Sequence, residues 1–326
     1  MSLAIGCRYV VSFDDFASGS GSALTAGRGG AGGASGGGGP GGAAVGGAGT
    51  GQGGNVVDAS PDTRVVDAPP DRGPRMPVTI YTPPMGATIG GITVDATYLY
   101  WAEGGRGIFR MLKAGLQNDA VFMHRASLEA FDVAVDDTYL YWADRDYFVW
   151  AMPRDGDVTS TPTQWFSHNV MAPRYIAVDN KQVVYVTIGP GDIVSGSPTA
   201  SFHPFSSQTG IAGIGFLGAT DAGQRIILWG HASGIRQGQS TGGKFDDLFA
   251  GGTDPVAGIA TDGVDMVWIS NNDMIKKGQP ASASQGDTGC ISPPQDLGPN
   301  ADIALDDQWI YFTWPNKNEI DKCPRY

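Results

Sequence analysis

Six polar side chains of this 326-residue chain are candidates for chemistry because they are expected at the ends of strands. Three directly follow a predicted strand and three lie in loops; the six are Glu103, Asp144, His231, Glu129, His168 and Arg174. Carboxylates and imidazoles that meet at one place can ligate a divalent cation or act as a general base. Solvated loop charges are the commoner explanation, because equivalent positions in other repeats hold Ile188, Ser270 and Trp314. We therefore assign no catalytic residue, no metal ligand and no cofactor.

A recurring twelve-residue segment decides where these side chains lie. Its clearest copies are ITVDATYLYWAE at 92–103 and VAVDDTYLYWAD at 133–144, each with one marker aspartate. The markers are Asp95, Asp136, Asp179, Asp221, Asp262 and Asp306, and successive markers are 41, 43, 42, 41 and 44 residues apart. A period of about 40–45 residues with several short strands per unit is typical of a propeller. The sequence therefore predicts an all-β, six-bladed β-propeller of four-stranded antiparallel blades.

The second repeat shows how each blade is expected to be built. Its predicted strands a to d are Val133–Val135, Tyr139–Ala143, Tyr147–Met152 and Thr163–Phe166, and strand d of the first repeat is Ala120–His124. Turn-forming residues separate the strands. In a propeller the b–c and d–a loops share one face, so the six polar candidates are expected on that face.

Small residues occupy the middle of strand a, namely Thr93, Ala134, Ala177, Ala260 and Ala304. The innermost strands converge on the axis, where bulky side chains would collide. Strand a therefore predicts a channel lined mainly by apolar and small residues. Such a channel favours binding over catalysis, since an enzyme needs a polar mouth.

Two further sets of residues have both a structural and a functional interpretation. The aromatic column of strand b comprises Trp101, Trp142, Trp229, Trp268 and Phe312. We expect it to pack between blades rather than to stack sugars or bases. The marker aspartates are expected to bond the backbone of their own turns rather than to serve as metal or catalytic carboxylates.

The last repeat lacks a fourth strand, whereas Pro77–Tyr81 before the first repeat forms a strand without a blade. We expect this N-terminal strand to complete the last blade and so protect its edge. Cys290 and Cys323 flank this blade and predict a disulfide, with two independent thiols as the alternative. No Cys-x-x-Cys pair or zinc-type Cys/His spacing is present.

The segments TYLYWAE and TYLYWAD resemble the YWTD repeats of low-density-lipoprotein-receptor propellers, and more broadly NHL and TolB-type six-bladed propellers. The resemblance covers about residues 77–326 and is weakest in the fourth repeat. It implies a propeller fold, but it does not imply one function, because propellers host binding proteins, scaffolds, lyases and lactonases.

The N-terminal region predicts a tethered protein of the cell envelope. Residues 1–7, MSLAIGC, resemble the end of a bacterial lipoprotein signal, with Cys7 as the lipidated residue. Residues 8–75 are rich in Gly, Ala and Ser and then acidic, which predicts a disordered linker before the propeller at 76–326. Arg8 lies where lipoproteins kept at the inner membrane carry Asp, which favours the outer membrane of a Gram-negative bacterium.

Charge excludes some partners and leaves two classes of function open. A net charge of −12 argues against nucleic acid and against charge-driven docking on an anionic membrane. The favoured function is an extracytoplasmic binding or scaffold module, expected to be monomeric, for a protein or small molecule held on one propeller face. The alternative is a propeller enzyme of the metal-dependent lactonase or lyase type that uses the b–c loop face.

Overall fold

The computed structural model describes residues 75–326, and the structural statements below concern these residues. Short gaps within this range are 116, 126–128, 168–170, 180–181, 190, 198–199, 208–209, 220–224, 232–233, 240–244, 251–254, 272, 281–283, 292–295 and 299. Cys7 and almost all of the expected linker lie outside the described residues, so lipid attachment and the linker stay predictions. No described helix is long and apolar enough to cross a membrane.

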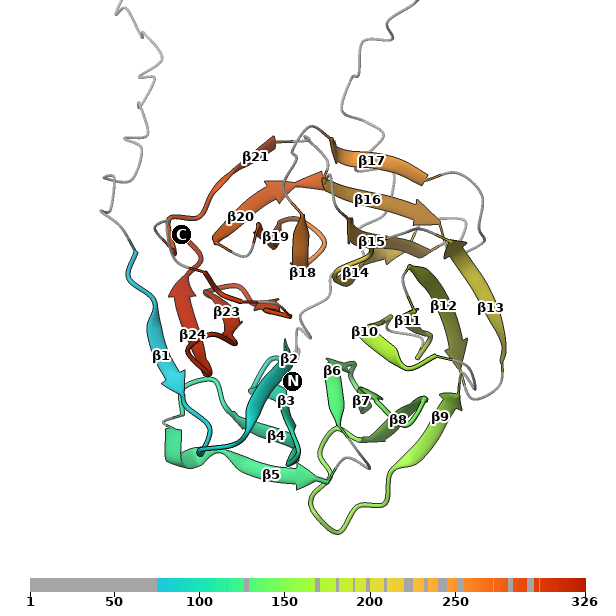
Figure 1. Cartoon of the computed structure of the whole chain (residues 1–326), viewed down its shortest axis with the longest axis vertical. Coiled ribbons are helices and arrows are strands. Elements are labelled where there is room, and N and C mark those ends of the chain that lie inside the picture. The colour runs from blue at the N-terminus through green and yellow to red at the C-terminus, as the bar shows by residue number, and fades with distance from the viewer. Residues whose placement is uncertain are drawn as a thin grey trace, which may run out of the picture. The chain divides into compact units, whose positions relative to one another are not determined.

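Six sheets of four antiparallel strands surround a central axis (Figure 1), which confirms the predicted six-bladed propeller. Blade 1 comprises β2 (Thr88–Val94), β3 (Tyr98–Gly104), β4 (Gly107–Leu112) and β5 (Val121–His124). Blade 2 comprises β6 (Ala130–Val135), β7 (Tyr139–Asp144), β8 (Phe148–Pro153) and β9 (Thr163–Ser167). Blade 3 comprises β10 (Pro173–Val178), β11 (Val184–Ile188), β12 (Asp192–Ser197) and β13 (Ala200–Ser207). Blade 4 comprises β14 (Ile214–Ala219), β15 (Arg225–His231), β16 (Gly234–Gln239) and β17 (Phe245–Ala250). Blade 5 comprises β18 (Val256–Thr261), β19 (Met266–Ser270), β20 (Met274–Gln279) and β21 (Ser284–Asp287). Blade 6 comprises β22 (Ile303–Leu305), β23 (Trp309–Trp314) and β24 (Glu319–Pro324), together with β1 (Val78–Tyr81) from the start of the propeller. A short 3-10 helix, η1 (Gln117–Asp119), precedes β5.

The innermost strand of blade 2 is longer than the sequence predicts. Strand β6 begins at Ala130 rather than Val133, and its pairing with β7 shifts register between Ala130 and Asp132. This shift is a β-bulge, which lets a strand continue through a residue that the ladder does not pair. The predicted start of strand a therefore missed a polar residue, Asp132, that lies inside the strand.

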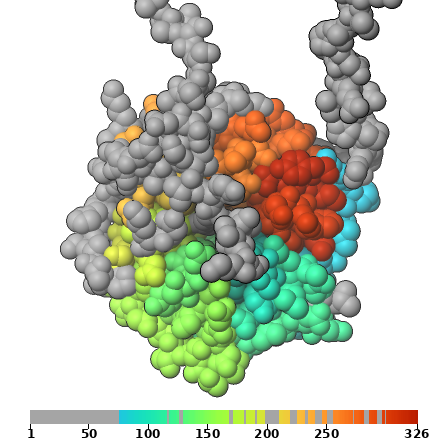
Figure 2. All heavy atoms as spheres, turned by 180° about the vertical axis from the view of Figure 1, so that it is seen from behind, coloured from blue at the N-terminus to red at the C-terminus, as the bar shows by residue number. Residues whose placement is uncertain are grey.

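Strand β1 closes the ring as predicted. It pairs antiparallel with β24, matching Val78 with Lys322 and Thr79 with Asp321. In the space-filling view the first described residues, in blue, lie against the red C-terminal blade (Figure 2). Because β1 covers β24, the last blade has four strands although its own sequence supplies three.

The disulfide between Cys290 and Cys323 is confirmed. Cys290 belongs to the segment that leads from blade 5 into blade 6, and Cys323 lies on β24, beside the closing strand. Both residues are buried in the apolar cluster between blades 5 and 6. The bond therefore adds a covalent link to the blade that closes the ring.

The aromatic column is part of the core. Its five residues, Trp101, Trp142, Trp229, Trp268 and Phe312, are at most 3% exposed. They lie on the second strand of their blades and pack in clusters that neighbouring blades share. Because the rings are covered, they serve packing and offer no open stacking surface.

The marker aspartates hold the a–b turns, as predicted. Asp136 accepts hydrogen bonds from the backbone N–H groups of Thr138 and Tyr139, at 2.7 Å each, and from the Tyr141 hydroxyl at 2.8 Å. Asp95 and Asp306 make the same three bonds in blades 1 and 6. Asp221 lies outside the described residues.

Four marker aspartates also pair with a cation from the following blade, which the sequence analysis did not anticipate. Arg154 of blade 2 lies 3.7 Å from Asp95, and Lys113 of blade 1 lies 2.8 Å from Asp306. Arg325 pairs with Asp262 at 2.6 Å, and Arg225 pairs with Asp179. The turn residues therefore also link successive blades around the ring.

Candidate functional site

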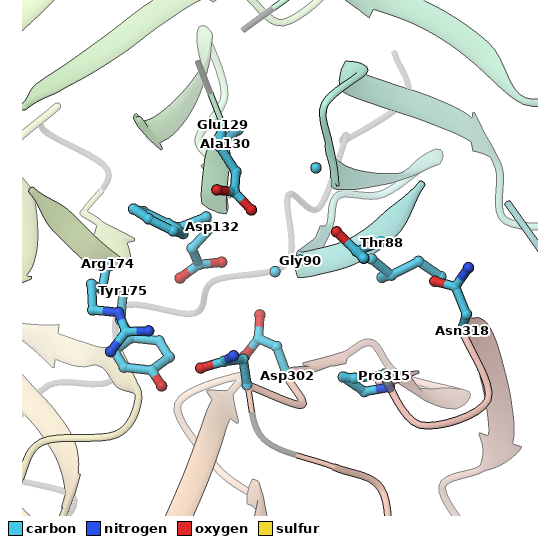
Figure 3. A pocket seen from close by; sticks show the side chains of 15 residues that line it. Thr88, Gly90, Glu129, Ala130, Asp132, Arg174, Tyr175, Asp302, Pro315 and Asn318 are labelled. Carbon is cyan, nitrogen blue, oxygen red and sulfur yellow. The ribbon is translucent and has the colours of Figure 1, made fainter. Parts of the chain in front are cut away.

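A pocket of about 270 Å³ opens at the channel end where the innermost strands begin. Its walls come from blades 1, 2, 3 and 6, and the residues used below are Thr88, Glu129, Asp132, Arg174, Tyr175 and Asp302. Figure 3 shows the carboxyl groups of Glu129, Asp132 and Asp302 turned toward the centre of the pocket, with Arg174 and Tyr175 to one side. The pocket therefore lies on the face where the b–c and d–a loops meet, which is the predicted ligand face.

Bulges in three inner strands determine which side chains reach this pocket. The pairing of each strand with its neighbour shifts register between Ile89 and Ile92, between Ala130 and Asp132, and between Pro173 and Ile176. Bulges bend a strand and redirect side chains, and they are common beside functional sites. In blade 3 the bulge contains Arg174 and Tyr175, and both of them line the pocket.

Asp132 and Asp302 form the floor of the pocket. Both also line a smaller cavity of about 60 Å³ deeper in the channel, so they separate the two spaces. Asp132 is 6% exposed and Asp302 is 9% exposed, and their side chains hydrogen-bond to each other. The channel mouth is therefore more polar than strand a led us to expect.

Backbone N–H groups of the next blade hold each aspartate. Asp132 accepts from Val133 N at 2.7 Å and from Ile176 N of blade 3 at 2.8 Å. Asp302 accepts from Ile92 N of blade 1 at 2.9 Å. Each carboxyl group thus connects its own blade to the following one, and this fixes its orientation in the channel.

Glycines make room for the two carboxyl groups. A Cβ atom on Gly91 would lie 1.8 Å from Asp132 Oδ1, which is impossible without displacing that side chain. A Cβ atom on Gly258 would lie 2.9 Å from Asp302 Cα and 3.0 Å from Asp302 Oδ1. The absence of side chains at these two positions in the inner strands lets the aspartates enter the channel.

The environment favours a proton on the aspartate pair. Burial raises the pKa of Asp132 well above its usual range, and the nearby Asp302 carboxylate raises it further. Burial raises the pKa of Asp302 to about 6, although backbone N–H groups and Asp132 oppose that rise. Two adjacent buried carboxyl groups titrate as a unit, and at neutral pH we expect them to share one proton.

Tyr175 adds a hydroxyl group beside the pair. Burial raises the pKa of Tyr175, Arg174 opposes that rise, and Asp302 and Asp132 add to it. The phenol therefore stays neutral at physiological pH and can both donate and accept a hydrogen bond. Its backbone N–H donates to Thr187 Oγ1 at 3.1 Å, which helps to hold the bulged segment.

The structure brings two of the six sequence candidates into this pocket, Glu129 and Arg174. The guanidinium group of Arg174 lies 5.8 Å from the centre of the Phe131 ring, a cation–π contact. Glu129 Oε2 lies 3.3 Å from the exposed guanidinium group of Arg145. His168 lies outside the described residues.

The other three candidates are buried in contacts with neighbouring side chains and backbone and do not line the pocket. Glu103 accepts from the hydroxyl of Tyr81, from Trp101 Nε1 at 2.9 Å and from Arg106, and so joins the closing strand to blade 1. Asp144 accepts from Glu129 N at 3.2 Å. His231 lies 3.9 Å from Asp247 in blade 4, and burial, together with Arg236, lowers its pKa.

Asp132, Tyr175 and Asp302 are not among the six sequence candidates, although the sequence holds a signal for them. All three lie four residues before a marker aspartate, and the same position holds Gly91 in blade 1 and Gly258 in blade 5. Because strand a was expected to start later, this position was assigned to a loop. Among the described residues, no three His, Cys, Asp or Glu side chains are grouped so that they could hold a metal ion.

Comparison with known proteins shows the fold alone. A chain of the nidogen/laminin complex matches with a TM-score of 0.55 and 15% identity, over 70% of this chain and 93% of that one. Virginiamycin B lyase from Staphylococcus aureus matches with a TM-score of 0.53 and 12% identity, over 74% and 82%. The WD40 propeller domain of Doa1 matches with a TM-score of 0.55 and 11% identity, over 75% and 95%.

By sequence the chain has no such match. No protein-family model matches it, and a search of curated proteins found no match. The solved structures that resemble it include a chain from a protein–protein complex and a lyase, at identities of 15% and below. What the comparisons establish is therefore the six-bladed β-propeller.

Proposed function

We propose that this protein is a binding module and that its site is the channel-mouth pocket. One observation carries the proposal: bulged strand starts of three blades and the loops of a fourth direct charged and polar groups into one pocket above a buried aspartate pair. Binding pockets commonly place a few convergent polar groups on a rigid scaffold. A solvated loop surface would not need buried carboxyl groups that backbone N–H groups of the next blade hold in place.

The ligand of this site is small and polar. The pocket volume of about 270 Å³ lies just below the range of roughly 300–1,000 Å³ that drug-sized ligands occupy. Carboxyl, guanidinium, phenol and amide groups line it beside apolar surface, so a ligand can gain several hydrogen bonds there. A protein partner would instead need a broad surface, typically near 800 Å² on each side.

We also propose that the propeller is displayed outside the cytoplasm, on a lipid attached to Cys7 and a flexible linker of residues 8–75. The Cys290–Cys323 disulfide supports an oxidising compartment, where such bonds form and persist. The repeats support a relation to YWTD, NHL and TolB-type propellers. We propose further that the displayed protein is a monomer. Metabolic palmitate labelling tests the anchor: label should enter the full-length precursor's product and be lost in Cys7→Ser.

A binding screen tests the proposed site. Ligand-observed NMR with a library of amines, amino acids, sugars and carboxylates should identify compounds that bind the purified protein. Binding should weaken in Glu129→Gln and in Arg174→Gln, and it should be unchanged in Lys277→Gln, which removes an exposed charge on blade 5. If no compound binds at millimolar concentration, or if the two pocket variants bind like wild type, the proposal is wrong.

The aspartate pair favours one second candidate, an enzyme that transfers protons. A carboxyl group and a carboxylate that share a proton can act as general acid and general base, worth about 10²–10⁴ in rate. Hydrolysis of p-nitrophenyl acetate or γ-butyrolactone should then be faster than in buffer, and Asp302→Asn, whose amide oxygen can still accept from Ile92, should remove most of that acceleration. Equal rates with and without the protein for both substrates would rule out this activity on esters and lactones.

A further inference from the structure

Opposite charges occupy different depths of the pocket. Arg174 is exposed at the rim, and its guanidinium group contacts the Phe131 ring. Within the described part of the chain, no carboxylate forms an ion pair with Arg174. The rim therefore presents a cation that can receive an anionic group from a ligand.

The floor of the pocket has the opposite character. Asp132 and Asp302 are buried there, and Glu129 lies on the wall beside them (Figure 3). The two aspartates accept hydrogen bonds from Val133, Ile176 and Ile92, and these come from neutral backbone groups. The shared proton thus occupies a place that a ligand's cationic hydrogen-bond donor can take.

We infer, on the basis of the proposed binding function, that the ligand is a small zwitterion with its ammonium group at the floor and its anionic group at the rim. The ammonium group replaces the proton shared by Asp132 and Asp302 and donates hydrogen bonds to both carboxylates. The anionic group meets Arg174. This pairing assigns one ligand charge to each charged end of the pocket.

Ligands with one charge fit the pocket less well. A simple amine reaches the floor but leaves Arg174 without an anionic partner. A simple carboxylate meets Arg174 but also faces Glu129, Asp132 and Asp302, and like charges at short range are unfavourable. Charge-assisted hydrogen bonds at both ends are roughly twice as strong as neutral ones, so a zwitterion gains more than either half.

Binding of an ammonium group is linked to release of the shared proton. The groups that face the aspartate pair are Tyr175 and Arg174 from β10, Glu129 at the start of blade 2, and the backbone of Gly91 from β2. A cation between the carboxyl groups favours their ionised form, so near neutral pH about one proton leaves as the ammonium group enters. A ligand that binds only at the rim does not displace this proton.

A series of ω-amino acids tests the inference on the purified full chain. The probes are glycine, β-alanine, 4-aminobutyrate and 6-aminohexanoate, with n-butylamine and butyrate as half-ligands. Isothermal calorimetry should find one amino acid that binds at least about tenfold more tightly than both half-ligands, because it makes charge-assisted contacts at both ends and each half-ligand makes them at one. Arg174→Gln should reduce that affinity to about the level of n-butylamine, and Lys277→Gln should leave it unchanged.

Proton release gives a readout that needs no variant. Calorimetry in two buffers with different ionisation enthalpies should show release of about one proton per bound amino acid near pH 7. This measurement matters because Asp132 accepts hydrogen bonds from two backbone N–H groups, and the Asp132→Asn variant that would otherwise test the floor can fail to fold. Binding without proton release would overturn the placement of the ammonium group at the floor.

The outcomes separate this inference from the proposed function. One outcome is that the half-ligands bind as tightly as every amino acid and that Arg174→Gln or Glu129→Gln abolishes this binding. That outcome would overturn the inference that the ligand is a zwitterion, but it would support the proposed binding pocket. Binding of sugars alone at the same pocket would do the same. If neither this series nor the wider library binds, both proposals fail.

Discussion

Asp302 directly precedes the short strand β22 and Asp306 directly follows it, yet the two residues have opposite electrostatic environments. Burial disfavours the charge of Asp306, but Lys113 and the backbone N–H groups of Gln308 and Trp309 outweigh it and lower its pKa. Burial raises the pKa of Asp302 to about 6. The same residue type is therefore a stable anion at one end of the strand and part of a proton-sharing pair at the other.

The difference comes from where the two ends of the strand lie in the ring. The Asp306 end reaches the a–b turn, where the following blade supplies a lysine. The Asp302 end points into the channel, where the following blade supplies the backbone N–H group of Ile92 and another blade supplies a second aspartate. Ring position, more than residue type, decides whether an aspartate stabilises the fold or forms part of a candidate site.

Removing the turn aspartate should have the largest effect. Asp306→Ala leaves the Tyr311 hydroxyl, Lys113 and two backbone N–H groups without their acceptor, so we expect a loss of roughly 3 kcal/mol in unfolding free energy. Asp307→Ala is the matched control, because Asp307 is exposed, and it should change stability by less than about 0.5 kcal/mol. Urea denaturation measures both, and equal losses would contradict the role of the turn aspartate.

Filling the space beside Asp132 should have the next largest effect. A methyl group at Gly91 collides with Asp132 Oδ1, so Gly91→Ala should cost about 2–3 kcal/mol and displace the carboxyl group. Gly215→Ala lies on an inner strand of blade 4, where the added atom would be 3.5 Å from Ile259, an ordinary contact. Thermal melts of the two variants should differ clearly, and similar melts would show that Asp132 can move aside without loss.

The channel pair should give stability a pH dependence opposite to that of the turn. The pKa of Asp302 is about 6 in the fold and near 3.9 in an unfolded chain, so between about pH 4 and 6 only the folded state keeps the proton. Stability therefore falls as pH rises through this window, and it keeps falling above it because the folded pair still holds a proton that the unfolded chain has released. Asp306 has a lowered pKa, so its contribution is present above about pH 4 and is lost on further acidification.

Asp302→Asn should remove the channel contribution. Its amide oxygen can still accept from Ile92, and its NH₂ group can donate to Asp132 in place of the shared proton. Between pH 4 and pH 7 the unfolding free energy of the variant should fall by about 1–2 kcal/mol less than that of wild type. The difference is limited because Asp132 still binds part of the proton that the pair shares in wild type. Urea denaturation at the two pH values measures this difference, and parallel pH profiles would contradict a shared proton.

The smallest effect should come from a partly exposed cation between blades. Arg154 is 28% exposed and lies 3.7 Å from Asp95, so Arg154→Gln should cost less than about 1 kcal/mol. Salt screens such pairs, so the difference from wild type should shrink at about 1 M NaCl. A loss that is large and independent of salt would mean that the pairs between blades matter more than their exposure suggests.

Most of the fold could be predicted from the repeats. The spacing of the marker aspartates specified six blades, the strand before the first repeat indicated the closure, and the two cysteines beside the last blade indicated the disulfide. These features depend on local residue patterns or on the number of strands, and both can be read directly from the sequence. The predicted strand ends were less accurate, because a bulge adds residues to a strand without changing its apolar alternation.

The site could be predicted only in part. Glu129 and Arg174 were found because loops before inner strands share one face. Glu103 and Asp144 are instead held away from the pocket by hydrogen bonds that the sequence did not reveal. The sequence by itself determined the number of blades, the turn aspartates and the order in which the blades follow one another. Only the tertiary structure brought Asp132 against Asp302, 170 positions further along the chain, because their contact depends on how sharply the closed ring curves and on the space that glycine leaves at position 91.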